Sequence, residues 1–213
     1  EIILVVIGIL IALQINNWNE HKKERNLEVK ILGEIQANLK RDHANLIMKI
    51  NETEGFKLAN HKVLDHLQQR TPLNDSLKFY YSRLNAYGNF RAITAGYENL
   101  KSIGLNLIQN DTLRSSISEL YDYHYFHFVE DIIHALEQFR ANKSKYVNDR
   151  IYLDKEGFTS GVPYDLNKLQ NDETFKGYLN STLVFHTWMN ERRQRGLEHI
   201  EYVVQQIENE LNK

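Results

Sequence analysis

The chain opens with an almost unbroken apolar run. Residues 2–15 read IILVVIGILIALQI, interrupted only by Gly8 and Gln14. A membrane-spanning helix needs about 20 mainly apolar residues, so the length of the run alone does not decide its nature. Trp18 lies where the pattern turns polar, as an indole does at a lipid headgroup boundary. We therefore expect residues 1–18 to form an uncleaved membrane anchor that is incomplete at its N-terminus.

The alternative is that this run is a β-branched strand of a protein core. The pattern that follows weakens it, because the next fifty residues continue as helix without a turn signal. Residues 18–69 contain no proline, and their apolar positions recur three and four residues apart. These positions are Leu27, Ile31, Leu32, Ile35, Leu39, Leu46, Ile47 and Ile50. We expect the anchor to continue as one long helix, which the NETEG segment at 51–55 could break.

Capping residues mark the later elements. Asn74 follows Pro72 and is the N-cap expected for a helix reaching Tyr87, while Thr94 begins a short helix that Gly104 ends.

Two further long helices are expected. One runs from the Asn110–Asp111 pair to about residue 152, and the other from the Asn171–Asp172 pair to about residue 211. Residues 153–165, LDKEGFTSGVPYD, are the loop between them. The sequence thus predicts an all-α protein, in which an N-terminal transmembrane helix (1–18) continues into an elongated bundle of long antiparallel helices (19–213).

Composition agrees with this class and excludes several functions. Two Pro and 10 Gly in 213 residues leave few chain breakers. The absence of Cys excludes disulfides, thiolate metal sites and Cys nucleophiles. A net charge of −2 argues against binding of nucleic acid, which depends on clustered Lys and Arg. We therefore expect no nucleic-acid partner.

Two stretches carry a resemblance. EIILVVIGILIALQINNWNE (1–20) and YENLKSIGLNLIQNDTLRSSI (97–117) resemble an uncharacterised family of single-pass membrane proteins from Bacteroidota, a domain of unknown function. The resemblance implies that a short Lys/Arg-rich segment and a few more apolar residues precede residue 1 and complete the span. It implies no activity, substrate or catalytic residue.

Orientation follows from the same implication. Lys22, Lys23 and Arg25 would by themselves draw their side of the anchor toward the cytoplasm. A basic segment upstream outweighs these three charges. We expect a protein of the bacterial inner membrane with a cytoplasmic N-terminus and a periplasmic region at 19–213.

One face of the anchor suggests self-association. On a helix, Glu1, Val5, Gly8, Ala12 and Ile15 lie within about 80° of one another, which places an acid beside a pair of small residues. This face is either a contact between copies that buries Glu1 as a protonatable group, or an incidental arrangement in which Glu1 is protonated or reaches the interface.

The strongest candidate for chemistry is a histidine stripe. His124, His127, Asp131 and His134 are spaced by three, four and three residues, so an α-helix aligns them as metal ligands could be aligned. The stripe is about 15 Å long, so only two neighbours could share an ion. The apolar residues of the segment predict a core on a different face. A solvated polar face is favoured over a contact between helices and over a metal site.

Two other groups have structural explanations. The cluster Glu191, Arg192, Arg193 and Arg195 could bind phosphate, but the four-residue spacing of Glu191 and Arg195 favours pairing on a solvated surface. An aromatic set could line a ligand pocket, although core packing is favoured. It comprises Phe79, Tyr80, Tyr81, Tyr87, Phe90 and Tyr97.

No catalytic motif is present: the sequence lacks GxSxG, a glycine-rich phosphate loop, HExxH and EF-hand spacing. We expect no catalysis and no cofactor, with a metal-dependent enzyme using His124 and His127 as the least favoured alternative. The preferred function is a membrane-anchored scaffold or accessory subunit that self-associates or binds an envelope protein. The alternative is a periplasmic sensor or ligand-binding module with an aromatic pocket.

Overall fold

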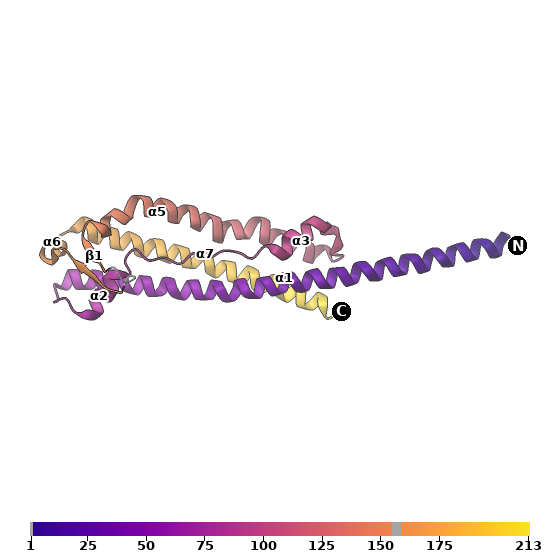
Figure 1. The fold of residues 1–213 in the computed structure, drawn as a ribbon, viewed down its shortest axis with the longest axis horizontal. Helices are drawn as coiled ribbons and strands as arrows, with labels where there is room; N and C mark the ends of the chain where they lie inside the picture. The colour runs from indigo at the N-terminus through magenta and orange to yellow at the C-terminus, as the bar shows by residue number, and fades with distance from the viewer. Residues whose placement is uncertain (1, 155–158) are drawn as a thin grey trace. The chain divides into compact units, whose positions relative to one another are not determined.

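The structure is a computed structural model that describes residues 2–154 and 159–213, with side chains described from residue 5 onward except at 142–144. Helices dominate it, which confirms the all-α class (Figure 1). The elements in chain order are α1 (Ile2–Gln69), α2 (Asp75–Ser82), α3 (Ala95–Ile103), the 3-10 helix η1 (Leu105–Leu107), α4 (Asp111–Glu119), the π-helices η2 (Leu120–His124) and η3 (Phe126–Glu130), α5 (Asp131–Asn148), the strands β1 (Ile151–Leu153) and β2 (Gly161–Pro163), α6 (Leu166–Gln170) and α7 (Glu173–Leu211).

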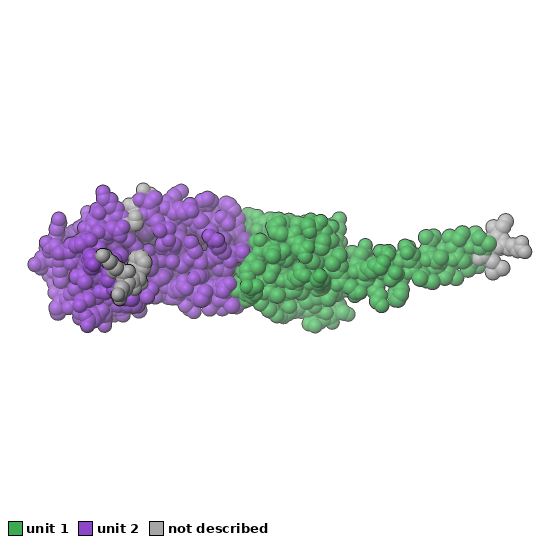
Figure 2. All heavy atoms as spheres, viewed as in Figure 1, with its two compact units in different colours: residues 1–42, 93–123, 199–213 green, residues 43–92, 124–198 purple. Residues whose placement is uncertain are grey.

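These elements form two compact units (Figure 2). Unit 1 contains residues 1–42, 93–123 and 199–213, and unit 2 contains residues 43–92 and 124–198. Each unit is built from segments that are distant in sequence.

In unit 1, α3 packs closely against α1 at Gly96. A Cβ added there would lie 3.1 Å from the backbone nitrogen of Ile35. The buried carboxylate of Glu28, only 1% exposed, accepts hydrogen bonds from Arg25 Nη1 (2.7 Å) and from the backbone N–H of Gln109 (2.9 Å). Glycine at position 96 and the paired Glu28 therefore position the connection after α3 on α1.

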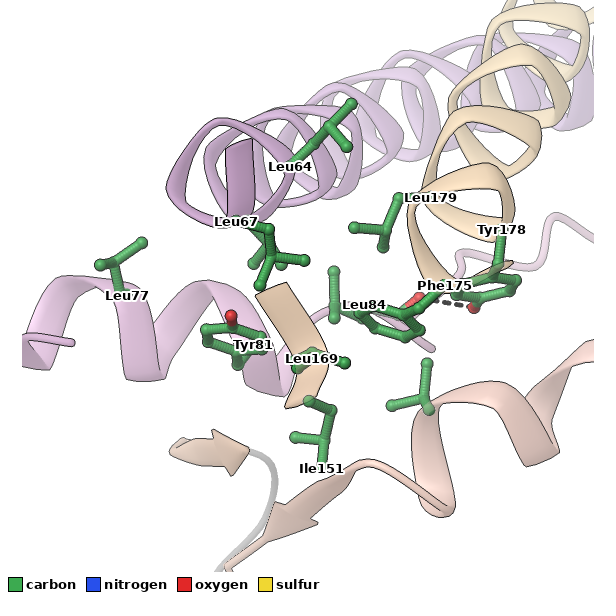
Figure 3. Packing of buried hydrophobic residues seen from close by; sticks show 12 residues of the cluster. Leu64, Leu67, Leu77, Tyr81, Leu84, Ile151, Leu169, Phe175, Tyr178 and Leu179 are labelled. Carbon is green, nitrogen blue, oxygen red and sulfur yellow. Dashed lines mark hydrogen bonds between the residues drawn. The ribbon is translucent and has the colours of Figure 1, made fainter. Parts of the chain in front are cut away.

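Unit 2 has a contiguous apolar core (Figure 3). It combines the end of α1 with α2, the end of α5, β1, α6 and the first turns of α7. Its members are Val63, Leu64, Leu67, Leu77, Tyr81, Leu84, Val147, Ile151, Leu169, Phe175, Tyr178 and Leu179. This core fixes the segment after α2 and the first turns of α7, which line the pocket described below.

Helix α1 passes through both expected boundaries. It runs without a break from the apolar N-terminal residues through Trp18, and NETEG does not interrupt it. Thr53 within that segment is buried, and its hydroxyl donates to the carbonyl oxygen of Lys49 (2.9 Å). The helix ends at Gln69, because the backbone of the next residue, Arg70, adopts a positive φ of 53°. Pro72 follows two residues after Arg70.

The expected N-caps are largely confirmed. Asn74 accepts from Leu77 N–H (2.9 Å), and Asp172 accepts from Phe175 N–H (2.9 Å). Thr94 is the N-cap residue of α3 but makes no capping hydrogen bond through its side chain. Gly104 ends α3 at a φ of 124°, a conformation that favours glycine.

Two predictions about the middle of the chain need correction. The helix expected from residue 110 to 152 ends at Asn148 and contains the π-helices η2 and η3. The segment 153–165 is not only a loop, because β1 and β2 pair in an antiparallel hairpin with Tyr152 opposite Val162. A Cβ at Gly161 would lie 2.8 Å from the backbone nitrogen of Ser82, so the hairpin needs glycine to approach α2.

Among the described residues, no helix combines the length and the apolar character needed to cross a bilayer.

Candidate functional sites: an apolar helix surface and a cationic pocket

The N-terminal part of α1 presents apolar side chains without cover. Every residue from 5 to 24 is exposed, and Figure 2 shows this segment projecting from the rest of unit 1. We call residues 5–18 the apolar helix surface. Its large exposed side chains are Val5, Val6, Ile7, Ile9, Leu10, Ile11, Leu13, Ile15 and Trp18. They extend around the helix rather than along one stripe, because they include neighbouring residues.

A polar segment begins directly after this surface. Lys22 Nζ lies 5.3 Å from the centre of the Trp18 ring, and Lys23 pairs with Glu20 at 2.9 Å. An indole beside a lysine at the end of an apolar segment is the arrangement found at membrane–water interfaces. The order apolar, aromatic, charged is thus present on one continuous helix.

The predicted self-association face lies on this surface. Val5 and Ile15 are 62% and 61% exposed, and a Cβ at Gly8 would meet nothing within 4 Å. Ala12 is exposed as well. Glu1 lies outside the described residues. The space beside Gly8 is sufficient for a second helix to approach.

Unit 2 contains a pocket of about 690 Å³. This volume lies within the range typical of small-molecule sites. Its apolar wall includes Phe56 of α1, Leu136 and Phe139 of α5, Leu153 of β1 and Tyr178 of α7. The pocket is therefore assembled from segments that are far apart in the sequence.

Two arginines contribute positive charge to the pocket. Arg83 follows α2, and Arg140 belongs to α5. Among the described residues that line the pocket there is no Asp or Glu. The buried Nε of Arg83 has no hydrogen-bond partner within the described part of the chain. The pocket therefore offers unneutralised cationic donors.

Aromatic rings hold both guanidinium groups. The Arg140 guanidinium carbon lies 4.5 Å from the centre of the Tyr87 ring, and that of Arg83 lies 4.9 Å from the centre of the Phe79 ring. Stacking of this kind orients a planar guanidinium and leaves its N–H groups at the edge available for an anion.

His186 adds a buried imidazole to the lining. It is 3% exposed, and its Nδ1 has no hydrogen-bond partner within the described part of the chain. Burial first, and then the positive charges of Arg193 and Lys57, lower its pKa from 6.5 to about 4, while Glu54 acts in the opposite direction. At neutral pH the ring is therefore uncharged and retains one donor and one acceptor nitrogen.

Amide and hydroxyl groups complete the polar lining. Tyr178 Oη donates to Asn85 Oδ1 at 3.1 Å and lies 3.4 Å from the carbonyl oxygen of Leu84, the contact drawn in Figure 3. The amide of Asn85 donates to Asn148 Oδ1 at 3.4 Å. These bonds link α7, the segment after α2 and the end of α5 around the pocket.

The histidine stripe is only partly brought together. His127 Nδ1 lies 3.1 Å from Asp131 Oδ2, and Arg192 Nη1 donates to the same oxygen at 3.2 Å. His124 lies in η2 and His134 in α5, and the π-helices alter the turn spacing on which the stripe was predicted. Among the described residues, no group of three or more His, Asp or Glu could hold a metal ion. The expected core face is confirmed, with Tyr125, Phe128, Val129, Ile132 and Leu136 buried.

The arginine cluster is not wholly a solvated surface. Arg193 is 1% exposed and donates to Thr53 Oγ1 (2.7 Å) and to the carbonyl oxygen of Gly88 (2.6 Å). Burial lowers its pKa to about 10, although Glu52 opposes the shift. Arg193 therefore ties α1 to the segment after α2 inside unit 2.

Half of the aromatic set predicted from the sequence lies in the core. Tyr81, Phe90 and Tyr97 are buried, and only Tyr87 of the set lines the pocket. Sequence reasoning missed Phe56, Phe139 and Tyr178. One signal was available: Tyr178, Thr182 and His186 are four residues apart and so share a face of α7.

Comparison with known proteins places the chain in a family. Residues 1–153 match the family of unknown function DUF6090. The chain belongs to this family. The match confirms the expectation of an uncharacterised family, and its description names no activity. No match was found among curated proteins or among solved structures.

Proposed function

We propose that this DUF6090 protein is a membrane-anchored helical scaffold or accessory subunit. The observation that carries the proposal is the apolar helix surface, where nine large apolar side chains lie uncovered on consecutive turns of α1. Burying a side chain of this size contributes about 1.5–3 kcal/mol, so a segment with several of them favours a lipid environment strongly over water. Trp18 and Lys22 then lie at the headgroup level.

The location follows from the anchor. We propose the bacterial inner membrane, with the N-terminus cytoplasmic and residues 19–213 periplasmic. What supports this orientation is the resemblance of the anchor sequence to single-pass proteins of Bacteroidota, in which a basic segment on the N-terminal side of the anchor is held in the cytoplasm. A single-pass anchor joined to a helical region without catalytic motifs is suited to holding a partner at the membrane or to assembling copies of the chain.

A vesicle flotation experiment tests the anchor. The full chain, reconstituted with vesicles of phosphatidylethanolamine and phosphatidylglycerol, is expected to float with the lipid at high salt. Ile9→Lys places a charge in the middle of the apolar surface and should lower the floating fraction severalfold, because a charge at the centre of a bilayer is costly. Val184→Lys, at a 70% exposed apolar residue of α7, is the matched control and should float like the unaltered chain. Equal flotation of both variants would count against the anchor.

A second candidate function is ligand binding by unit 2. The observation that favours it is the pocket, which combines apolar walls with two arginines and a buried imidazole. In this case the chain is a membrane-anchored sensor or binding module, and the ligand reaches it outside the membrane.

A further inference from the structure

From the lining of the unit 2 pocket we propose that its ligand is a small aromatic carboxylic acid, with the carboxylate bound by Arg83 and Arg140 and the ring packed against Phe56, Phe139 and Tyr178. This inference rests on the second candidate function and specifies its ligand class. It is independent of the membrane anchor.

The charge of the pocket selects an anion. Two guanidinium groups line it, no carboxylate does among the described lining residues, and the buried Nε of Arg83 is a donor without a hydrogen-bond partner in the described part of the chain. A buried donor without a partner is unfavourable, and an anion that accepts its hydrogen bond removes that cost. Guanidinium matches a carboxylate through two parallel hydrogen bonds, which a neutral ligand cannot accept in the same way.

The pocket also places a ring against its walls. Phe139 stacks on Phe185 with ring centres 4.5 Å apart, and Tyr178 stacks on Tyr146 with ring centres 5.5 Å apart. Each of these two lining rings therefore packs against an aromatic ring that does not line the pocket. Phe56 lies 6.1 Å from the His186 ring on another wall. Flat, fixed aromatic walls favour a ligand ring, which can stack or meet them edge to face.

His186 supports a polar ligand rather than a purely apolar one. His186 is only 3% exposed, and its Nδ1 has no hydrogen-bond partner within the described part of the chain. A neutral imidazole can donate to or accept from a ligand group without adding charge. The Asn85 and Asn148 amides provide further polar positions in the lining.

The test compares acids with their neutral analogues. Phenylacetate and indole-3-acetate are titrated into the full chain in mild detergent at pH 7, followed by calorimetry, beside 2-phenylethanol and tryptophol. Empty micelles supply the blank. The acids are expected to bind at least tenfold more tightly than the alcohols, a difference of about 1.4 kcal/mol.

Arginine variants assign the binding to the pocket. Arg140→Gln and Arg83→Gln should each weaken binding of the acids about tenfold and leave binding of the alcohols within twofold. Arg195→Gln, at an exposed arginine of the same unit outside the pocket lining, is the matched control and should change neither. Thermal melting followed by circular dichroism establishes that each variant is folded.

The outcomes separate the two ideas. Alcohols that bind as tightly as the acids, or acids that ignore both pocket arginines, would overturn the ligand class while leaving ligand binding in place. If no probe binds at a concentration on the order of 10 mM, where even a weak ligand would be detected, both the ligand class and the second candidate function are overturned. Neither result would affect the flotation of the chain.

Discussion

At the scale of single residues, burial rather than residue type decides what the charged side chains do. Arg193 looks like its exposed neighbours in the sequence, yet it lies inside unit 2 and bonds to Gly88 and Thr53. The sequence could not reveal this, because the carbonyl oxygen of Gly88 reaches Arg193 only after the segment following α2 has packed. The pocket residues Phe56 and Phe139 were missed for the same reason.

His186 gives a pH dependence at this scale. Its pKa is about 4 in the folded chain, whereas an unfolded histidine titrates near 6.5. Between these values the unfolded state binds more protons, so stability falls as the pH falls from 6.5 to about 4 and is constant outside that window with respect to this residue. From pH 7 to pH 5 the loss of unfolding free energy from His186 should be about 2 kcal/mol.

Urea unfolding of the Trp18→Phe chain measures this effect, since Trp188 of α7 then reports on unit 2. His186→Gln should show a correspondingly smaller loss between pH 7 and pH 5. His66 also has a lowered pKa through burial, but it is present in both chains and cancels in the comparison. If the Trp18→Phe chain and its His186→Gln variant lose the same unfolding free energy between pH 7 and pH 5, the pKa of His186 is not lowered in the folded state.

At the scale of elements, local signals were predicted well and long-range ones were not. The caps at Asn74 and Asp172 depend on hydrogen bonds three residues away, so the sequence contains all the information needed. The β1–β2 hairpin depends on the approach of Gly161 to Ser82 in α2, and three-residue strands leave little pattern to detect. The π-helices η2 and η3 likewise have no simple signature in the spacing of apolar residues.

The N-terminal part of α1 allows a prediction about self-association. Gly8 has open space beside it, and the exposed Ala12 lies four residues further on, so a second helix can approach this face closely. Gly8→Ile should block that approach and reduce the oligomer mass measured in mild detergent by light scattering. Ile7→Leu, beside it, keeps the volume and should leave the mass unchanged. An unaltered mass for Gly8→Ile would place any interface elsewhere.

At the scale of the whole molecule, the all-α class was predictable because few glycines and prolines interrupt long periodic segments. The division into two units was not predicted, since unit 1 joins parts of α1 and α7 with residues 93–123, and unit 2 takes the rest. The apolar helix surface was the feature most visible in the sequence, and the pocket was the least visible.

We propose that the apolar N-terminal residues hold the chain in a membrane. Carbonate extraction of membranes from cells that produce either the full chain or a chain lacking residues 1–18 tests this proposal. We predict that the full chain stays in the membrane pellet, while the shortened chain appears in the soluble fraction with its helical circular dichroism retained. A full chain released by carbonate, or a shortened chain that still pellets with the membranes, would contradict the claim.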